Sequence, residues 1–413
     1  MYNGVDIGSN VGHFVDEFTS EIADAVDTNE AVQITQDLVR APSENPPGRE
    51  HLAAAVARQW LEEAGCEGFE EFEEFEGRTN LIASWGDSSS GPRLIFNGHL
   101  DVVPAADADG WDNPPFSAVV KDGKIFGRGT SDMKSGIAAM IEAVAALNRV
   151  GFKPRGHVQF QLVADEESFG RHGTEFLLRK NLLAGDAAVI GEPTSLMICL
   201  GERGAYWATI HATGRAAHGS VPEQGISAIE KVAKAAVALH GREFSESHPL
   251  LGKPTLNVGT IAGGTKVNVV ADRASISIDR RAVPGETEEG VQGQIEAILE
   301  EIKAGDPDCE FNIEVFGFAE PSIIQKDAPI VRLLADSVES QTGGPPDYYG
   351  SPGATDARFL RNQGRIPAVV FGPGIMGAAH TVNEFADVAS IGIASKVYAE
   401  LAYRFFSTWE TAS

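Results

Sequence analysis

Cysteine is scarce in this sequence, and its spacing excludes two classes of stabilised fold. The three cysteines, Cys66, Cys199 and Cys309, lie far apart, their number is odd, and no CxxC pair occurs. Disulfide frameworks need paired cysteines, and cysteine metal sites need closely spaced ones. We therefore expect neither a disulfide scaffold nor a cysteine-ligated metal.

Long apolar runs are also missing. No run of apolar residues could cross a bilayer, and the first residues, MYNGVDIGSNVGHFVDEF, contain neither a basic leader nor an apolar signal core. We expect a soluble, cytoplasmic protein without a membrane partner.

Positive charge is the third shortage. The chain has 33 lysine and arginine residues against 59 aspartate and glutamate residues, a formal net charge of −26. Such a surface repels nucleic acid and anionic membranes, so neither is an expected partner. A dense carboxylate surface is also typical of proteins adapted to high salt, which leads to the hypothesis of a halophilic source.

The length of 413 residues exceeds the size at which one core stops growing, so we expect two domains. From Leu94 to Gly201 short apolar runs alternate with helical stretches, which predicts an α/β catalytic domain with a central, mostly parallel sheet flanked by helices. Residues 1–203 and 317–413 are assigned to it. Residues 1–30 are polar and acidic with no clear element, and we expect an appendage there.

The pattern changes between residues 204 and 316. Four strand-like runs, YWATIHAT, TLNVGTI, ASISIDR and EFNIEVF, are interleaved with helical stretches at 226–239 and 288–302. The resulting order is βαββαβ, which predicts a ferredoxin-like α+β domain inserted into the first.

Polar side chains able to bind a metal follow several predicted strands of the first domain. They are His99, Asp101, Asp132, Glu166, Glu167, Glu192 and His380. Ligands of open α/β sheets gather at the carboxyl ends of strands, so these side chains should converge on one crevice. Two histidines with several carboxylates suit Zn²⁺, or Co²⁺ or Mn²⁺, and carry enough charge for two ions.

Each of these residues has a simpler interpretation. A histidine after a strand is usually a surface or core residue, an aspartate before a helix is usually its N-cap, and adjacent glutamates are usually solvated. The metal-site hypothesis is favoured because all the simpler interpretations would have to hold together.

Several segments of the sequence, including those that contain these residues, resemble the M20 family of metallopeptidases and deacylases. They run in the order of that family from about residue 90 to residue 390: NGHLDVVP, WDNPPFSAVVKDGKIFGRGTSDMKSG, ADEESFG, GEPT, GRAAHGSVPEQGISAI, NVVADRASISIDRRAVPGE, SPGATDARFL and AHTVNEF. DRRAVPGE and TDARF are most similar to the branch containing acetylornithine deacetylase and succinyl-diaminopimelate desuccinylase.

The resemblance implies a metal centre of two zinc ions. His99 and Glu192 would hold one ion, Glu167 and His380 the other, and Asp132 would bridge them. It also implies that the peptide bond following Asp132 is cis.

The resemblance further implies a hydrolytic mechanism. Glu166 would be the general base that activates a metal-bound water for attack on an amide. Asp101 would accept the ring N–H of His99 and fix its tautomer. His218 would stabilise the oxyanion from the neighbouring subunit, which implies a homodimer formed through the inserted lid domain.

Four further residues match the substrate-binding positions of the family. Arg281 would fork onto the substrate carboxylate, and its neighbour Arg280 could be confused with it. Asn268, Gly353 and Thr355 would contact the same carboxylate or the tetrahedral intermediate. A strand-end asparagine and a turn glycine are the structural alternatives.

The expected function is therefore removal of an N-acyl group from an amino acid, within amino-acid biosynthesis. A metallo-dipeptidase or carboxypeptidase of the same family is the first alternative, because one metal centre and carboxylate clamp serve both reactions. A binding or regulatory homologue without catalysis is the more remote one, and the presence of every ligand and of the base disfavours it.

Overall fold

The computed structural model describes residues 8–89, 91–105 and 110–409, which separate into two compact units. The first unit contains the described residues up to Leu200 together with Ile324–Tyr349 and the chain from Phe359 onward. The second contains Gly201–Ile323 and the short segment Gly350–Arg358. The short segment lies within the range 317–413 that the sequence analysis assigned to the catalytic domain.

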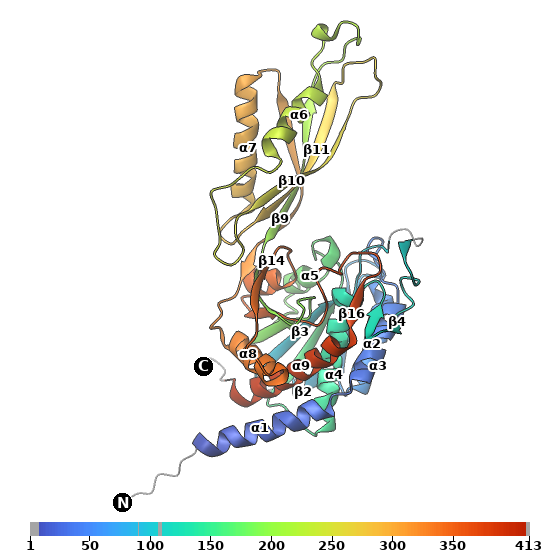
Figure 1. The fold of residues 1–413 in the computed structure, drawn as a ribbon, viewed down its shortest axis with the longest axis vertical. Helices are drawn as coiled ribbons and strands as arrows, with labels where there is room; N and C mark the ends of the chain where they lie inside the picture. The colour runs from blue at the N-terminus through green and yellow to red at the C-terminus, as the bar shows by residue number, and fades with distance from the viewer. Residues whose placement is uncertain (1–7, 90, 106–109, 410–413) are drawn as a thin grey trace, which may run out of the picture. The chain divides into compact units, whose positions relative to one another are not determined.

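The first unit is built on a mixed sheet flanked by helices (Figure 1). The strand order is β1-β2-β6-β3-β7-β15-β8. Their bounds are β1 Glu67–Glu73, β2 Thr79–Gly86, β3 Arg93–His99, β6 His157–Val163, β7 Ala187–Ile190, β8 Ile198–Glu202 and β15 Ala368–Val370.

Parallel pairing in this sheet is confined to its centre. The neighbours β6, β3, β7 and β15 are parallel, whereas the pairs β1–β2, β2–β6 and β15–β8 are antiparallel. The predicted mostly parallel sheet is therefore wrong at both edges. Apolar runs predict strands but carry no information on direction, which is set by the connections between them.

Helices cover the sheet and one another. The pairs α4–α9, α8–α9 and α2–α4 pack together, and α3 packs on β2. The helices of this unit are α1 Gly8–Ala25, α2 Thr28–Arg40, α3 Glu50–Glu63, α4 Ser135–Arg149, α5 Thr174–Arg179, α8 Pro329–Thr342 and α9 Val388–Thr408. A small three-stranded sheet adds β4 Val119–Lys121, β5 Lys124–Phe126 and β16 Phe385–Asp387.

Helix α1 corrects the expectation of an N-terminal appendage without an element. It packs against α9 and α4, Ile22 is fully buried, and the ring of Phe18 lies 5.0 Å from that of Tyr403. The residues that cover α1 come from distant parts of the chain, so the local sequence carried only a weak signal.

The second unit has the element order β9-α6-β10-β11-α7-β12, and its antiparallel sheet has the order β10-β11-β9-β12. The bounds are β9 Gly204–Thr213, α6 Ala228–Leu239, β10 Thr255–Gly263, β11 Arg273–Ala282, α7 Glu288–Gly305 and β12 Glu310–Ala319. The core contains alternate residues of the strands, such as Ile276 and Ile278, together with apolar residues of α6 and α7. Two short strands, β13 Ser322–Ile323 and β14 Tyr348–Ser351, pair with β8.

No helix in the described part of the chain is long and apolar enough to cross a membrane.

Candidate metal centre

Three adjacent parallel strands place the candidate ligands at one edge of the first unit's sheet. His99 ends β3 and lies opposite Val163, the last residue of β6, and Glu166 and Glu167 follow shortly after. Glu192 follows β7, which pairs with β3 on its other side. The carboxyl ends of these strands therefore bring together side chains that are up to 93 positions apart in the sequence.

Asp132 enters the site from the segment that precedes α4. Gly136, in the first turn of α4, lies so close to β7 that a Cβ atom there would be 2.0 Å from the carbonyl oxygen of Gly191. This close approach holds the start of α4 against the residue that precedes Glu192. The Asp132–Met133 peptide bond is cis, as the resemblance implies.

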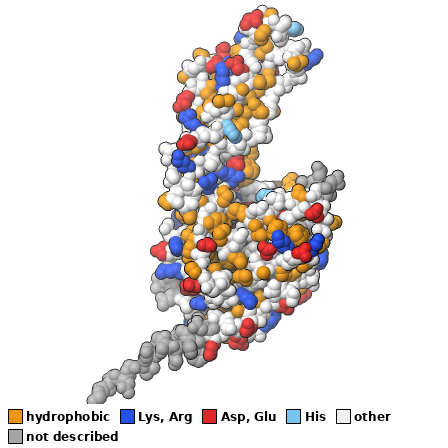
Figure 2. Space-filling model, viewed as in Figure 1, with side chains coloured by type: hydrophobic (Ala, Val, Ile, Leu, Met, Phe, Trp, Pro, Cys, Tyr) orange, Lys and Arg blue, Asp and Glu red, His pale blue; other side chains and the backbone are white. Residues whose placement is uncertain are grey.

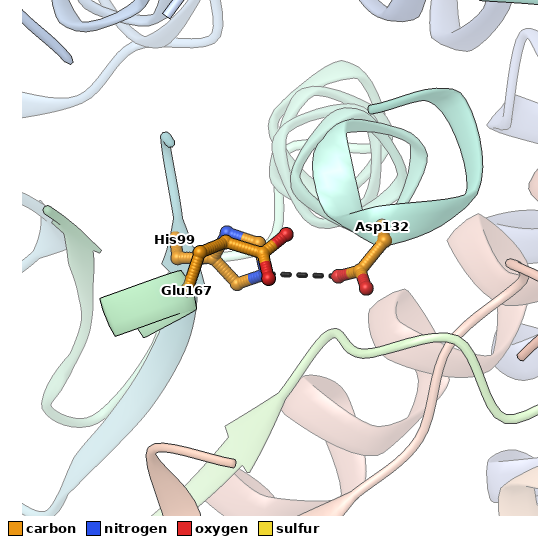
Figure 3. A group of neighbouring side chains, drawn as sticks. All are labelled: His99, Asp132 and Glu167. Atoms are coloured by element: carbon orange, nitrogen blue, oxygen red, sulfur yellow. Dashed lines mark hydrogen bonds and ion pairs between the residues drawn. The ribbon is translucent and has the colours of Figure 1, made fainter. Parts of the chain in front are cut away.

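The two oxygens of Asp132 face two different histidines. His99 Nε2 lies 2.9 Å from Asp132 Oδ1, and His380 Nε2 lies 3.3 Å from Asp132 Oδ2. Figure 3 shows Asp132 pointing toward His99 and Glu167, which come from separate elements. A carboxylate placed between two imidazoles in this way has the geometry of a bridging ligand.

The remaining carboxylates each lie near one of the two histidines. Glu192 Oε1 is 3.7 Å from His99 Nε2, whereas Glu167 Oε2 is 2.9 Å from His380 Nε2. Among the described residues, two groups have ligand atoms within 4.8 Å of one another: His99 with Asp132 and Glu167, and His99 with Glu166 and Glu192. The donor set of nitrogen and carboxylate oxygen atoms fits divalent metal ions.

Burial makes the charges of this cluster depend on one another. Desolvation raises the pKa of Glu192 well above its ordinary value, and the neighbouring charge of Asp132 adds to the rise. Hydrogen bonds to Asp132 and Glu167 raise the pKa of His380 to about 10. For His99, burial opposes protonation, but the hydrogen bond to Asp132 and the charge of Glu192 outweigh it and raise the pKa. Carboxylates gathered in a buried site need cations, and metal ions would supply them.

Asp101 has a different partner from the one expected. The Nδ1 atom of His99 lies 2.9 Å from the main-chain oxygen of Asp101 and 3.6 Å from its carboxylate. That carboxylate instead accepts the backbone N–H groups of Glu166 and Glu167, both at 3.2 Å. The main-chain oxygen of Asp101 is already the partner of the His99 ring nitrogen. The Asp101 carboxylate therefore fixes the turn that carries Glu166 and Glu167.

Sequence reasoning missed Glu384, a fully buried carboxylate in the string AHTVNEF. Its Oε1 accepts the backbone N–H groups of Ser131 at 2.8 Å and Asp132 at 3.1 Å, and its Oε2 pairs with Arg128 Nη1 at 2.5 Å. Glu384 thus holds the backbone of Asp132. The only sequence signal was its place four residues after His380.

His218 and Asn268 lie side by side within the second unit. His218 forms a β-bridge with Val269, and the N–H of Gly219 donates to the main-chain oxygen of Asn268 at 2.8 Å. The His218 ring is exposed and lies 2.7 Å from the hydroxyl of Ser220. The fold of this unit therefore presents the two residues as one exposed group.

Arg281 and Arg280 point to opposite faces of β11. Arg280 is fully buried, bonds Glu286 and Gln294, and packs over the ring of Phe244. Arg281 is partly exposed and pairs only with Asp279 among the contacts the structure gives it. Of the two neighbours, Arg281 is the one that a ligand can reach.

Gly353 and Thr355 belong to the short segment of the second unit. The Thr355 hydroxyl donates to the buried carboxylate of Glu202 at 2.7 Å and accepts the N–H of Ala357 at 3.2 Å. The N–H of Gly353 donates to the Ser351 hydroxyl at 3.1 Å. Both residues already have partners within their own segment, so their role as a carboxylate clamp stays a prediction.

The chain matches the model of the peptidase family M20/M25/M40 over residues 95–404. It is 30% identical over 396 residues to a succinyl-diaminopimelate desuccinylase of Rhodospirillum centenum, covering 91% of this chain and 97% of the relative. It is 32% identical over 390 residues to the protein of the same name from Phenylobacterium zucineum, covering 92% of this chain and 99% of the relative.

Solved structures share the fold at lower identity. A tripeptidase from Staphylococcus aureus superimposes with a TM-score of 0.78 at 22% identity, covering 93% of this chain and all of the other. Human carnosine dipeptidase 1 gives a TM-score of 0.78 at 19% identity, with 94% and 99% covered. A Bacillus subtilis protein described as a dinuclear metal-binding peptidase gives 0.69 at 20% identity, with 92% and 100% covered.

Proposed function

The chain belongs to the peptidase family M20/M25/M40 and is a hydrolase of amide bonds, and from this premise we propose that it removes an N-acyl group from an amino acid. The relatives that support this activity are succinyl-diaminopimelate desuccinylases, and they match along more than nine tenths of both chains. N-succinyl-diaminopimelate is therefore the first substrate to test, and N-acetyl-ornithine the second.

The observation that carries the proposal is the position of Asp132 between two histidines. We assign His99 and Glu192 to one metal ion and Glu167 and His380 to the other, with Asp132 shared. Zinc is the proposed metal, with cobalt or manganese as substitutes. When bound, a pair of such ions polarises the amide carbonyl and lowers the pKa of water.

Glu166 is the proposed general base. Its carboxylate belongs to the group that includes His99 and Glu192, so it lies close to the metal ligands. Glu166 would take a proton from the attacking water and donate it to the departing amine. Asp101 would hold Glu166 in place by accepting the backbone N–H of Glu166.

Replacement of Glu166 tests this assignment. Glu166→Ala should abolish turnover of the N-acyl amino acid while the protein still binds two equivalents of zinc, measured by atomic absorption after dialysis. Glu63→Ala, which removes an exposed glutamate of α3, is the matched control and should keep full activity. Full activity in Glu166→Ala would overturn the role of the base.

A peptidase activity is the second candidate, because two of the structural neighbours described above are a tripeptidase and a dipeptidase. A panel of N-succinyl-diaminopimelate, N-acetyl-ornithine, N-acetyl-lysine and dipeptides separates the two, with kcat/KM as the measure. Turnover confined to dipeptides would overturn the deacylase proposal.

We also propose that the second unit is a ferredoxin-like lid that forms a homodimer. Its order βαββαβ leaves β10 at a sheet edge, and such an edge can pair with a second copy. Apolar side chains lie exposed nearby, including Ile261 on β10 at 59% and Val237 on α6 at 84% exposure. Figure 2 shows hydrophobic side chains among the polar ones on the drawn face of this unit.

Subunit complementation tests the dimer and the role of His218 together. A mixture of His218→Ala and Glu166→Ala chains, unfolded and refolded together, should recover activity that neither variant has alone, because one site of a mixed dimer is then complete. Sedimentation velocity gives the oligomeric state. A monomer, or a mixture without activity, would contradict this arrangement.

A further inference from the structure

Arg78 belongs to a hydrogen-bonded group with three buried carboxylates close to the candidate metal ligands. Glu50 and Asp101 are fully buried and Asp165 is 2% exposed, whereas the side chain of Arg78 is only 12% exposed. None of the four belongs to the proposed metal ligands. Charged groups removed from water in this way are stable only when they are paired and hydrogen-bonded.

Arg78 joins two of these carboxylates. Its Nε lies 3.0 and 3.1 Å from the two oxygens of Glu50, and its Nη2 donates to Asp165 Oδ1 at 2.7 Å. The backbone leaves room for the side chain: Gly48 has a φ of +87°, and a Cβ there would lie 2.3 Å from Arg78 Cδ. The Arg78 guanidinium thus pairs with Glu50 at the start of α3 and with Asp165 shortly after the end of β6.

Asp165 connects Arg78 to the turn that carries Glu166 and Glu167. Asp165 itself has a left-handed backbone with a φ of 69°. Its Oδ2 accepts the N–H of His172 at 3.1 Å, and its main-chain oxygen accepts the N–H of Gly170 at 2.6 Å. Asp165 therefore holds the turn through its main-chain oxygen and its carboxylate, and Arg78 pairs with that carboxylate.

A second connection reaches the same turn through Asn45. The amide nitrogen of Asn45 lies 2.9 Å from Asp101 Oδ2 and 3.4 Å from Asp165 Oδ1. Asp101 in turn accepts the backbone N–H groups of Glu166 and Glu167. The turn is therefore held from two sides, through Asp165 and through Asp101.

We propose that Arg78 is a positioning residue for Glu166 and Glu167, acting through Asp165. Without Arg78, the buried carboxylate of Asp165 would lose the cation that pairs with it and would turn toward water. The turn would then loosen, and the base and the ligand it carries would no longer be held for reaction. The effect on catalysis rests on the proposed function, whereas the effect on the turn does not.

Hydrogen exchange of the turn tests the proposal without a substrate. Amides of residues 164–172 should exchange faster in Arg78→Met than in the wild-type protein, measured by mass spectrometry at equal metal content. Arg58→Met is the matched control, because Arg58 is 42% exposed and its ion pairs are with the exposed Glu62 and Glu71. Unchanged exchange at 164–172 in Arg78→Met would overturn the proposal.

Steady-state kinetics tests the consequence for catalysis. Arg78→Met should lower kcat roughly 10- to 100-fold with KM little changed, as for other residues that orient metal-site groups. The kcat of Arg78→Lys, which keeps the charge but reaches fewer oxygens, should fall between those of Arg78→Met and the wild-type enzyme. This variant provides the test if Arg78→Met does not fold. A loss confined to KM or to thermal stability would contradict a positioning role.

A double variant shows whether Arg78 acts through Asp165. Arg78→Met combined with Asp165→Asn should be little slower than the slower single variant, whereas independent roles would multiply the two losses. Multiplied losses would overturn the route through Asp165. If the wild-type enzyme hydrolyses no N-acyl amino acid, the proposed function fails, and hydrogen exchange still decides the role of Arg78.

Discussion

Glu384 offers a direct test of how the backbone of Asp132 is held. Glu384→Ala removes the acceptor of the Ser131 and Asp132 N–H groups and leaves Arg128, only 3% exposed, without its carboxylate. Breaking a buried ion pair from one side costs about 3 to 5 kcal/mol, and each stranded N–H adds about 1 to 3 kcal/mol where water cannot reach it. We therefore expect a loss of at least about 3 kcal/mol in the free energy of unfolding.

Urea denaturation of the metal-free protein, followed by circular dichroism at fixed ionic strength, measures this loss. Glu384→Gln should lose less free energy of unfolding than Glu384→Ala, because its amide oxygen can still accept the two N–H groups. Adding Arg128→Met to Glu384→Gln should recover part of the stability. Glu339→Ala, at an exposed position of α8, is the control. A Glu384→Ala protein within about 1 kcal/mol of wild type would refute the reasoning, since that loss is typical of an average substitution.

Three further predictions concern pH, the substrate carboxylate and salt. Burial and the charge of Asp101 raise the pKa of Glu50 from 4.5 to about 7, so the folded protein keeps a proton that the unfolded chain releases, and stability should fall as pH rises from about 4.5 to 7. Glu50→Gln should flatten this part of the urea-denaturation profile, and an unchanged slope would contradict the assignment. Arg281→Ala should raise KM with little change in melting temperature, whereas Arg280→Ala should lower the melting temperature because Arg280 is fully buried; the reverse pattern would exchange their roles. With a net charge of −26, activity and melting temperature should both rise toward molar potassium chloride, and independence from salt would count against the halophilic hypothesis.

The order of strands and helices was accessible from the sequence because it depends on local patterns. The strands β3, β6 and β7 each contain apolar residues of the runs that predicted them, and Glu288–Ile302 has helical spacing and became most of α7. The predicted membership of the M20 family and the hydrolysis of amide bonds are confirmed. The assignment of individual ligands, the metal and the dimer stay predictions.

The direction of the edge strands and the partners of buried charges were not accessible in the same way. Asp132 and Glu384 are 252 positions apart, and Arg78 and Asp165 are 87 apart. A local pattern cannot indicate which distant carboxylate an arginine will meet. Asp101 is an example. The string NGHLDVVP shows that it is close to His99 in the sequence, but not that its carboxylate accepts the N–H groups of Glu166 and Glu167.

The sequence by itself determined which side chains can bind metal and where along the chain they occur, because strand ends and ligand types are local properties. Only the tertiary structure decided that Asp132 lies between His99 and His380, that Glu384 and Asp101 accept backbone N–H groups beside the candidate ligands, and that Arg78 pairs with Glu50 and Asp165. The reason is physical. Coordination geometry and the pairing of buried charge are fixed by contacts between distant segments, and those contacts exist only once the sheet has assembled.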